Sequence, residues 1–327
     1  MSDSTSISYT AAFILIKLYG MSLDPQLHLL IDKKAQEYYL RTIPHLPFPL
    51  NLFHKILKYP AVRKSLITLE DNILPGDLMH LLMRKKYIYE ELVRARTDGF
   101  EQLVVIGSGF DFAGIRWAMW GGSSFELDRP RTHALKKKLN RVSQFNPPTL
   151  WYLPVGENEN DFDRMLRVHP FFDPDKPTVF IAEGFLDYLS KEEVYQAFES
   201  IKNTSDQSQR FVFTLFDFEA MNPLHARIIR DSVAVVGEKL GYNIGRKHIE
   251  KLLAEYGFWA RSIVDPHMMR NEKLAPLGIA NPLFTDFYII RADSVEIPET
   301  SKPAPVIETN NGNEILEEDL GSILKSS

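Results

Sequence analysis

The sequence predicts an α/β protein with a doubly wound, mostly parallel sheet and a helical N-terminal region. From about residue 100, short apolar runs alternate with helical patterns, which is typical of a sheet covered by helices on both faces. Before residue 98, apolar residues recur at helical spacing and no run alternates as a strand does. We therefore expect a helical cap over residues 1–98 and a sheet-based core over residues 99–296. Residues 297–327 are rich in Pro, Ser, Asn and Glu, so we expect a mobile tail there.

Prolines divide the N-terminal region into separate helices, because proline interrupts a helix interior. The predicted helices are Ser8–Tyr19, Gln26–Leu40, Leu50–Lys58, Ala61–Asp71 and Gly76–Thr97. In the last and longest of these, most apolar residues fall on one face at helical spacing. That face should pack against the rest of the protein.

The core is predicted to contain seven strands and six helices. The strands are expected at Gln102–Ile106, Ser124–Leu127, Thr149–Pro154, Thr178–Ala182, Phe211–Leu215, Ala260–Val264 and Asp286–Arg291. The helices are expected at Phe112–Trp120, Arg131–Gln144, Glu159–Val168, Lys191–Ile201, Pro223–Gly237 and Arg246–Glu255. The last two strands resemble the antiparallel hairpin found at one edge of such sheets.

The composition argues against several classes of function. A formal net charge of −5 disfavours nucleic-acid binding, which needs a concentrated basic surface. Without cysteine there can be no disulfide, thiolate nucleophile or cysteine-ligated metal, and we expect no metal site. The apolar run Ala11–Ile16 has no basic leader and is interrupted by Lys17, and no window approaches the roughly 18 apolar residues of a membrane span. We therefore expect a cytoplasmic protein without membrane or nucleic-acid partners.

A glycine-containing turn follows the first predicted strand, in the segment VVIGSGFD, residues 104–111. Gly107, Ser108 and Gly109 would let the backbone turn sharply and approach a ligand, and the next helix would offer its unpaired N–H groups. Dinucleotide dehydrogenases carry a third glycine in this turn, and here Phe112 stands in its place. Asp111 is unfavourable beside a pyrophosphate but favourable beside a cationic ligand. The turn alone is compatible with dehydrogenases and with methyltransferases.

Acidic residues end two of the predicted strands. Asp128 follows the second strand, nineteen residues after Gly109, where a carboxylate can accept both ribose hydroxyls of an adenosine. Glu126 lies on the same face of that strand and is the competing candidate, whereas capping of the next helix is the other role open to Asp128. Glu183 follows the fourth strand, and burial there requires a partner for its charge. Ser190 and Glu193 form a capping box, so Ser190 is assigned a structural role.

These motifs resemble those of the leucine carboxyl methyltransferase family. The resemblance lies in RKKYIYEELVRARTDGFEQLVVIGSGFDFAGIRW, in FELDRP and in PTVFIAEGFLDYLSKEEV, and it runs from about Arg84 to Phe213. It implies a class I methyltransferase (Rossmann-like) fold, with a seven-stranded sheet, an antiparallel edge strand and N-terminal helices that close over the cofactor. It also implies S-adenosylmethionine as the cofactor.

The resemblance assigns roles to individual residues. Arg84 matches the arginine that holds the methionine carboxylate, a role that suits a guanidinium. Without the resemblance, Arg84 would be assigned to a solvated helix face together with Lys85 and Lys86. The turn of Gly107, Ser108 and Gly109, with Asp111 beside it, matches the cofactor loop. Asp128 matches the ribose ligand, and Glu183 matches the acid near the methionyl amino group or the acceptor.

One segment departs from the family pattern. Family members usually carry an acidic stretch after the third strand, where adenine is recognised, but here Pro154, Val155 and Gly156 stand in its place. Recognition of adenine would then fall to Glu157, Asn158 or backbone groups. This departure leaves open a catalytically silent cofactor-binding module of the same fold. An NAD-dependent oxidoreductase is a further alternative, which Phe112 and Glu183 disfavour.

We expect an O-methyltransferase that acts on a carboxylate or hydroxyl of a small molecule. A carboxylate needs no general base, whereas a hydroxyl does, and Tyr188, His169 and His225 are the candidates for that role. Tyr188 and Glu183 are the candidate catalytic residues, and the alternative for Tyr188 is simple packing under the cap. The acceptor pocket is predicted between the N-terminal helices and the segment Asp217–Asn222.

Overall fold

The computed structural model describes residues 8–156, 162–235 and 237–294, and its strands form one sheet. The strands are β1 (Gln102–Ile106), β2 (Ser123–Asp128), β3 (Leu150–Pro154), β4 (Thr178–Ala182), β5 (Gln209–Phe216), β6 (Trp259–Val264) and β7 (Phe287–Asp293). Their order is β3-β2-β1-β4-β5-β7-β6, and β7 runs antiparallel to both of its neighbours. The predicted mostly parallel sheet and its antiparallel hairpin are therefore confirmed.

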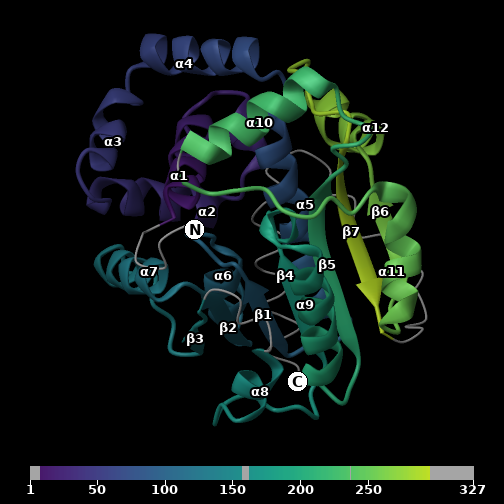
Figure 1. Cartoon of the computed structure of the whole chain (residues 1–327). Coiled ribbons are helices and arrows are strands. Elements are labelled where there is room, and N and C mark those ends of the chain that lie inside the picture. The colour runs from purple at the N-terminus through teal and green to yellow at the C-terminus, as the bar shows by residue number, and fades with distance from the viewer. Residues whose placement is uncertain (1–7, 157–161, 236, 295–327) are drawn as a thin grey trace.

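Helices cover both faces of the sheet, as predicted. The helices of the core are α6 (Ala113–Met119), α7 (Pro130–Val142), α8 (Phe162–Arg167), α9 (Lys191–Thr204), α10 (Pro223–Val235), α11 (Ile249–Glu255) and α12 (Pro266–Met269). Val105 and Ile181 point to the face covered by the N-terminal helices and α6, whereas Val104 and Phe180 point to the face covered by α8, α9 and α11. Helix α10 crosses the upper end of the strands beside α1 (Figure 1).

The N-terminal region is helical, with boundaries that differ from the predicted ones. It contains α1 (Tyr9–Ser22), α2 (Lys33–Thr42), α3 (Phe53–Ile56), α4 (Pro60–Ile73) and α5 (Asp77–Thr97). The single helix predicted over Gln26–Leu40 is wrong, because a 3₁₀ turn at Leu27–Leu30 precedes α2. Asp32 separates the two elements: its carboxylate accepts the N–H groups of Lys34 and Ala35 at 3.0 Å each and caps α2.

Two further predicted helices begin later than expected. Leu50–Lys58 holds a 3₁₀ turn and the short α3, and Arg246–Glu255 opens with a 3₁₀ turn before α11. The expected start of the helix at Glu159 and the expected mobile tail lie outside the described residues.

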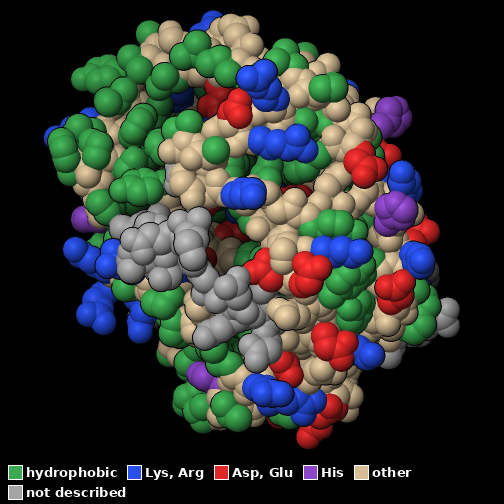
Figure 2. Space-filling model, viewed as in Figure 1, with side chains coloured by type: hydrophobic (Ala, Val, Ile, Leu, Met, Phe, Trp, Pro, Cys, Tyr) green, Lys and Arg blue, Asp and Glu red, His purple; other side chains and the backbone are tan. Residues whose placement is uncertain are grey.

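Helix α4 is attached to the protein more by polar contacts than by apolar burial. Its apolar side chains at helical spacing are 38% to 55% exposed, namely Val62, Leu66, Leu69 and Ile73. Figure 2 shows hydrophobic side chains gathered over α3 and α4 on this face of the molecule. Arg63 donates to the carbonyl of Leu57 at 3.0 Å, and Lys17 of α1 pairs with Glu70 of α4 and with Asp77 of α5. These contacts hold α4 at the rim of the N-terminal region.

A charged pair is buried beneath the sheet between β2 and α7. The Lys136 ammonium lies 2.7 Å from a Glu126 carboxylate oxygen, and neither side chain is exposed to solvent. Gly114 of α6 leaves room for this carboxylate, since a Cβ there would lie 2.4 Å from Glu126 Oε1. Burial raises the pKa of Glu126 to about 7, against the lowering effect of Lys136. The pair joins α7 to β2, and Gly114 lets α6 pack closely over it.

Replacing Lys136 with Met should destabilise the protein more at high pH than at low pH. The variant leaves an uncompensated carboxylate in the interior at pH 8, which costs about 3–5 kcal/mol. A carboxyl whose pKa is higher in the folded than in the unfolded state favours folding most at low pH, and this contribution disappears as pH rises through the folded pKa. The loss measured by urea unfolding should therefore be smaller at pH 5, where Glu126 takes up a proton. Lys138→Met, at an exposed position of the same helix, is the matched control and should change stability by about 0.5 kcal/mol or less. Equal losses at both pH values for Lys136→Met would contradict this explanation.

Candidate functional site

A cavity of about 530 Å³ lies at the carboxyl ends of β1, β2 and β4, where open parallel sheets bind ligands. Its floor is formed by the loop Gly107–Asp111, by the end of β2 and by the turn that follows β4. Its roof is formed by α1, α10 and residues 237–240. The cavity therefore lies between the N-terminal helices and the sheet.

The glycine turn adopts the conformation that its sequence predicts. Gly107 and Gly109 have positive φ angles of 67° and 45°, which favour glycine. A Cβ on Gly107 would lie 2.5 Å from the ring of Phe185, and the backbone N–H groups of Gly107 and Ser108 donate to the carbonyl of Leu127 at 2.9 and 3.1 Å. Ser108 turns its hydroxyl toward buried His133, 3.5 Å away. Ser108 therefore faces the cavity mainly through its backbone.

Asp128 lies at the end of β2 and lines the cavity. Its carboxylate accepts the N–H of Gly109 at 2.5 Å and that of Arg129 at 2.7 Å, and burial raises its pKa. Helix α7 starts at Pro130 without a side-chain cap, so the capping role considered for Asp128 is wrong. Glu126, the competing candidate, is paired with Lys136 and is not among the residues that line the cavity. Of the two carboxylates of this strand, Asp128 is thus the one that lines the cavity.

Four charged side chains meet where α5, the β1 loop and the end of β4 come together. Arg84 Nε donates to Glu183 Oε1 at 2.9 Å. Lys85 Nζ lies 2.8 Å from Asp111 Oδ2 and 2.8 Å from Glu183 Oε1. We call Arg84, Lys85, Asp111 and Glu183 the charge cluster. All four line the cavity, so the structure brings together three residues predicted separately and adds Lys85.

In the charge cluster, burial raises the pKa values of the two carboxyl groups, whereas the neighbouring cations lower them. Burial alone would raise the pKa of Asp111, but Lys85, with smaller contributions from Glu183 and Lys136, holds that pKa well below its usual range. Burial raises the pKa of Glu183, and Lys85 and Arg84 offset only part of that rise. Asp111 also accepts the N–H groups of Phe112 and Ala113, and so helps to begin α6. The two cations and two carboxylates leave the cluster without net charge.

Lys85 is a site residue that the sequence reasoning missed. It was grouped with a solvated helix face, but its side chain is only 14% exposed and has two carboxylate partners. A signal was present, because Lys85 is four residues after Leu81 and three before Ile88, both buried on the inner face of α5.

The turn after β4 brings two further polar residues to the cavity. Tyr188, the predicted pocket residue, lines the cavity, and burial raises the pKa of its phenol. Asp187, which the sequence reasoning did not single out, also lines it and is 6% exposed. Its Oδ1 accepts the N–H of Phe216 at 3.2 Å, and burial raises its pKa to about 7.

Residues Asp217–Asn222, beside which the acceptor pocket is predicted, do not line the cavity. The Asp217 carboxylate accepts the N–H groups of Glu219 and Ala220 in its own loop and that of Arg246 in the 3₁₀ turn before α11, at 2.9–3.3 Å. The wall is instead formed by α10, through Ile229 and Val233, and by residues 237–240.

Glu238, in the part of the roof that follows α10, forms hydrogen bonds to two other elements that line the cavity. Its carboxylate accepts the Ser8 hydroxyl at 3.1 Å and an Arg129 nitrogen at 2.9 Å. The start of α1, the loop after α10 and the end of β2 are thereby joined at one point.

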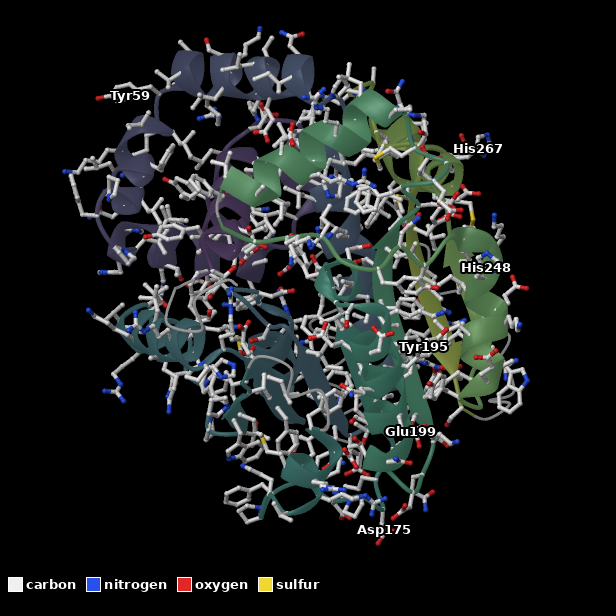
Figure 3. All side chains as sticks on the ribbon, in the orientation of Figure 1. Tyr59, Asp175, Tyr195, Glu199, His248 and His267 are labelled. Carbon is white, nitrogen blue, oxygen red and sulfur yellow. The ribbon has the colours of Figure 1, made fainter. Side chains whose placement is uncertain are left out.

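The histidines lie elsewhere, since none of those in the described ranges lines the cavity. His169 packs against the rings of Phe125 and Trp151, and His225 lies on α10 away from the cavity wall. His248 and His267 project from the outer edge of the molecule (Figure 3). Of the three bases considered from the sequence, Tyr188 alone reaches the cavity.

Two other predictions concern residues near the site. Val155 and Gly156 line the cavity, whereas Glu157 and Asn158, considered for adenine recognition, lie outside the described residues.

Among the residues that the structure describes, there is no group of three or more His, Asp or Glu side chains that could hold a metal ion. No helix in the described part of the chain is long and apolar enough to cross a membrane.

Comparison with known proteins gives a consistent result. The family model described as leucine carboxyl methyltransferase matches residues 55–202. A "putative S-adenosyl-L-methionine-dependent methyltransferase" of Mycolicibacterium vanbaalenii is 25% identical over 216 residues, 64% of this chain and 72% of that protein. One of the same name from Mycobacteroides abscessus is 32% identical over 134 residues, which cover 40% of this chain and 42% of the relative. The alignments thus span between 42% and 72% of these two relatives.

Solved structures share the fold at low sequence identity. A putative methyltransferase of Thermobifida fusca has a TM-score of 0.54 and 13% identity, covering 82% of this chain and 97% of that one. A DUF574 family protein of Streptomyces avermitilis has a TM-score of 0.52 and 13% identity, covering 72% and 90%. These matches confirm the resemblance found in the sequence motifs. The chain is similar to the leucine carboxyl methyltransferase family over residues 55–202 and to relatives named S-adenosyl-L-methionine-dependent methyltransferases. It shares the fold of the solved methyltransferase of Thermobifida fusca.

Proposed function

We propose that this protein transfers the methyl group of S-adenosylmethionine to a carboxylate or hydroxyl oxygen of a small-molecule acceptor. One observation carries the proposal: Asp128, the glycine turn and the charge cluster line a single cavity, in that order, across the ends of β2, β1 and β4. Ribose, the thioether chain and the amino-acid end of the cofactor follow one another in the same order.

The residues present fit this cofactor chemically. Asp128 offers a carboxylate for the two ribose hydroxyls, and its bond to the Gly109 N–H fixes its position. Gly107 and Gly109 adopt the positive φ angles that the turn of the loop requires beside the cavity. In the charge cluster, Arg84 uses Nε for Glu183, and within the described residues its two terminal nitrogens have no hydrogen-bond partner. They are available to a carboxylate, which a guanidinium holds with two bonds.

The amino-acid end of the cofactor is a zwitterion and suits a neutral, alternating cluster. Its carboxylate would lie against Arg84, and its ammonium against the carboxylates of Glu183 and Asp111. A dinucleotide pyrophosphate would instead face three carboxylates: Asp111, Asp128 and Glu183. Phe112 also stacks on Tyr38, with ring centroids 5.0 Å apart, at the position where dehydrogenases need a glycine. The oxidoreductase alternative is therefore disfavoured.

The bound cofactor supplies an electrophilic methyl group on a sulfonium, so the protein has to align the acceptor and exclude water. Apolar side chains of α1 and α10 line the roof of the cavity, among them Ile14, Leu18, Ile229 and Val233. We assign residues 1–98 the role of a cap on this basis. Tyr188 and Glu183 lie in the same cavity and are available to position the acceptor.

Replacing Arg84 tests which residue holds the amino-acid end of the cofactor, as distinct from its ribose end. Arg84→Ala should weaken binding of S-adenosylhomocysteine about 10- to 100-fold, because it removes a charge-assisted contact to the carboxylate. It should leave binding of methylthioadenosine, which lacks the amino-acid end, unchanged within about twofold. Isothermal calorimetry with both ligands measures the difference. Arg94→Ala, on the same helix but outside the cavity, is the control and should bind both normally. Equal weakening of both ligands by Arg84→Ala would contradict the assignment.

Asp128→Asn should weaken both ligands, since both contain the ribose. We expect a loss of about tenfold or more for each in the same calorimetric assay. Asn keeps one oxygen, which can accept the Gly109 N–H, and loses the oxygen that accepts the Arg129 N–H, so a thermal melt of the unliganded variant is needed to show that it is folded. Normal affinity for methylthioadenosine would show that Asp128 does not hold the ribose.

A thermal-shift comparison tests the class of cofactor. S-adenosylmethionine and S-adenosylhomocysteine should raise the melting temperature in a concentration-dependent way, and NAD should not. Stabilisation by NAD alone would overturn the methyltransferase proposal. No response to any of the three would count against the assigned cofactor site, whereas a silent cofactor-binding module would still be stabilised by S-adenosylmethionine.

A further inference from the structure

Asp187 is a buried carboxyl in the cavity wall that the cofactor assignment does not use. It lies in the 3₁₀ turn Leu186–Tyr188 directly after β4, and it is 6% exposed. The N–H of Phe216 holds its Oδ1 at 3.2 Å. No lysine, arginine or histidine of the described residues forms an ion pair with it, unlike Glu183 and Asp111. A carboxyl left without a cation in such a place costs stability, which points to a role beyond the fold.

The sheet order places Asp187 on the β5 side of the cavity. Asp128 stands at the end of β2, and the charge cluster stands between the ends of β1 and β4. Asp187 bridges the turn after β4 to the last residue of β5, through Phe216. Asp187 lies on the β5 side of the charge cluster, close enough for the Arg84 guanidinium to act on its carboxyl. An acceptor approaching the methyl group from the side of β5 would meet it.

The surroundings of Asp187 are apolar apart from a few named groups. Phe185, Tyr188, Phe216 and Leu240 line the cavity near its turn, and its backbone carbonyl accepts the N–H of Gly241 at 2.8 Å. Of the charged groups, Arg84 of α5 acts on Asp187 directly, and Glu238 faces the adjacent Tyr188 from the loop after α10. Burial raises the pKa of Asp187 to about 7, with Arg84 and the Phe216 N–H opposing the rise. A carboxyl with such a pKa can take up a proton and release it again near neutral pH.

We propose that Asp187 accepts the proton of a hydroxyl group, and that the acceptor is an apolar, hydroxyl-bearing small molecule. This proposal rests on the proposed methyl transfer and narrows its acceptor. The acceptor oxygen forms the new bond to the methyl carbon while the carbon–sulfur bond breaks, and that electron pair stays on sulfur. The hydroxyl proton passes to Asp187 Oδ2, and solvent takes it when the product leaves. A carboxylate acceptor has no proton to give and would bring a second negative charge beside a buried carboxyl, which is unfavourable.

Binding of sinefungin tests the position of Asp187 without a known acceptor. Sinefungin is an analogue of S-adenosylhomocysteine with an amino group in the place of the transferred methyl, and this group is cationic at neutral pH. Asp187→Asn should weaken sinefungin about tenfold and leave S-adenosylhomocysteine within about twofold, because only sinefungin places a cation beside the carboxylate. Asn retains an oxygen for the Phe216 N–H, and normal S-adenosylhomocysteine binding shows that the variant is folded. Glu192→Gln, exposed at the start of α9, is the control and should change neither affinity.

The possible outcomes distinguish the proposed role of Asp187 from the proposed methyl transfer. An unchanged ratio of sinefungin to S-adenosylhomocysteine affinity in Asp187→Asn would overturn the role of Asp187 and leave the methyltransferase proposal standing. Failure of the unmodified protein to bind either ligand would overturn both.

The bond formed on the product tests the acceptor class. Small molecules from a cell extract are incubated with the protein and with S-adenosylmethionine labelled in its methyl group. Alkali releases the label of a methyl ester as methanol but leaves a methyl ether intact. We expect alkali-stable label with the unmodified protein and at least a tenfold loss of it in Asp187→Asn. Chiefly alkali-labile label would overturn the hydroxyl acceptor, and absence of transferred label would count against methyl transfer itself.

Discussion

The buried contact between Arg84 and Glu183, shared with Lys85 and Asp111, is the constraint on which the rest of the site depends. It joins the long helix α5 to the ends of β1 and β4, so it sets where the N-terminal helices lie over the sheet. Ion pairs of this kind add little net stability compared with apolar packing, because both partners lose their hydration. Removing one partner is costly, however, since the other remains buried and charged. The cluster therefore restricts geometry more than it adds to the free energy of folding, and a site that has to hold a zwitterion can use that same geometry.

The cavity has a polar side and an apolar side, and each comes from a different part of the chain. The carboxyl ends of the strands supply charged and backbone groups at fixed positions, because the sheet behind them is packed on both faces. Helices α1 and α10 supply mainly aliphatic side chains. Asp187 stands where the two sides meet. This division matches a reaction in which the cofactor carries the reactive carbon and the protein supplies alignment and a dry environment.

Much of the fold could be predicted from the sequence, because two of its signals are local. Strands β1 and β4 match their predicted bounds, since each is a fully buried apolar run between polar or turn residues. Asp128 and Glu183 were found because they follow such strands directly. Lys85 was missed because a charge in a helix is normally assigned to solvent, and Asp187 because a three-residue turn has no periodicity. The wall made by α10 depends on how that helix crosses the sheet, and no local pattern specifies a crossing.

The hydrogen bond between Ser8 and Glu238 can form only after most of the chain has been synthesised. These residues are 230 positions apart, and Glu238 also holds Arg129 of the second strand. During synthesis on the ribosome, the first helices and half of the sheet leave the exit tunnel well before the residues that complete the roof. Contacts between distant parts of a chain form late and slowly, because a long loop has to close first. The cavity should thus be the last region to reach its final form, and a nascent chain shorter than about 240 residues would present an open, unroofed sheet edge to chaperones.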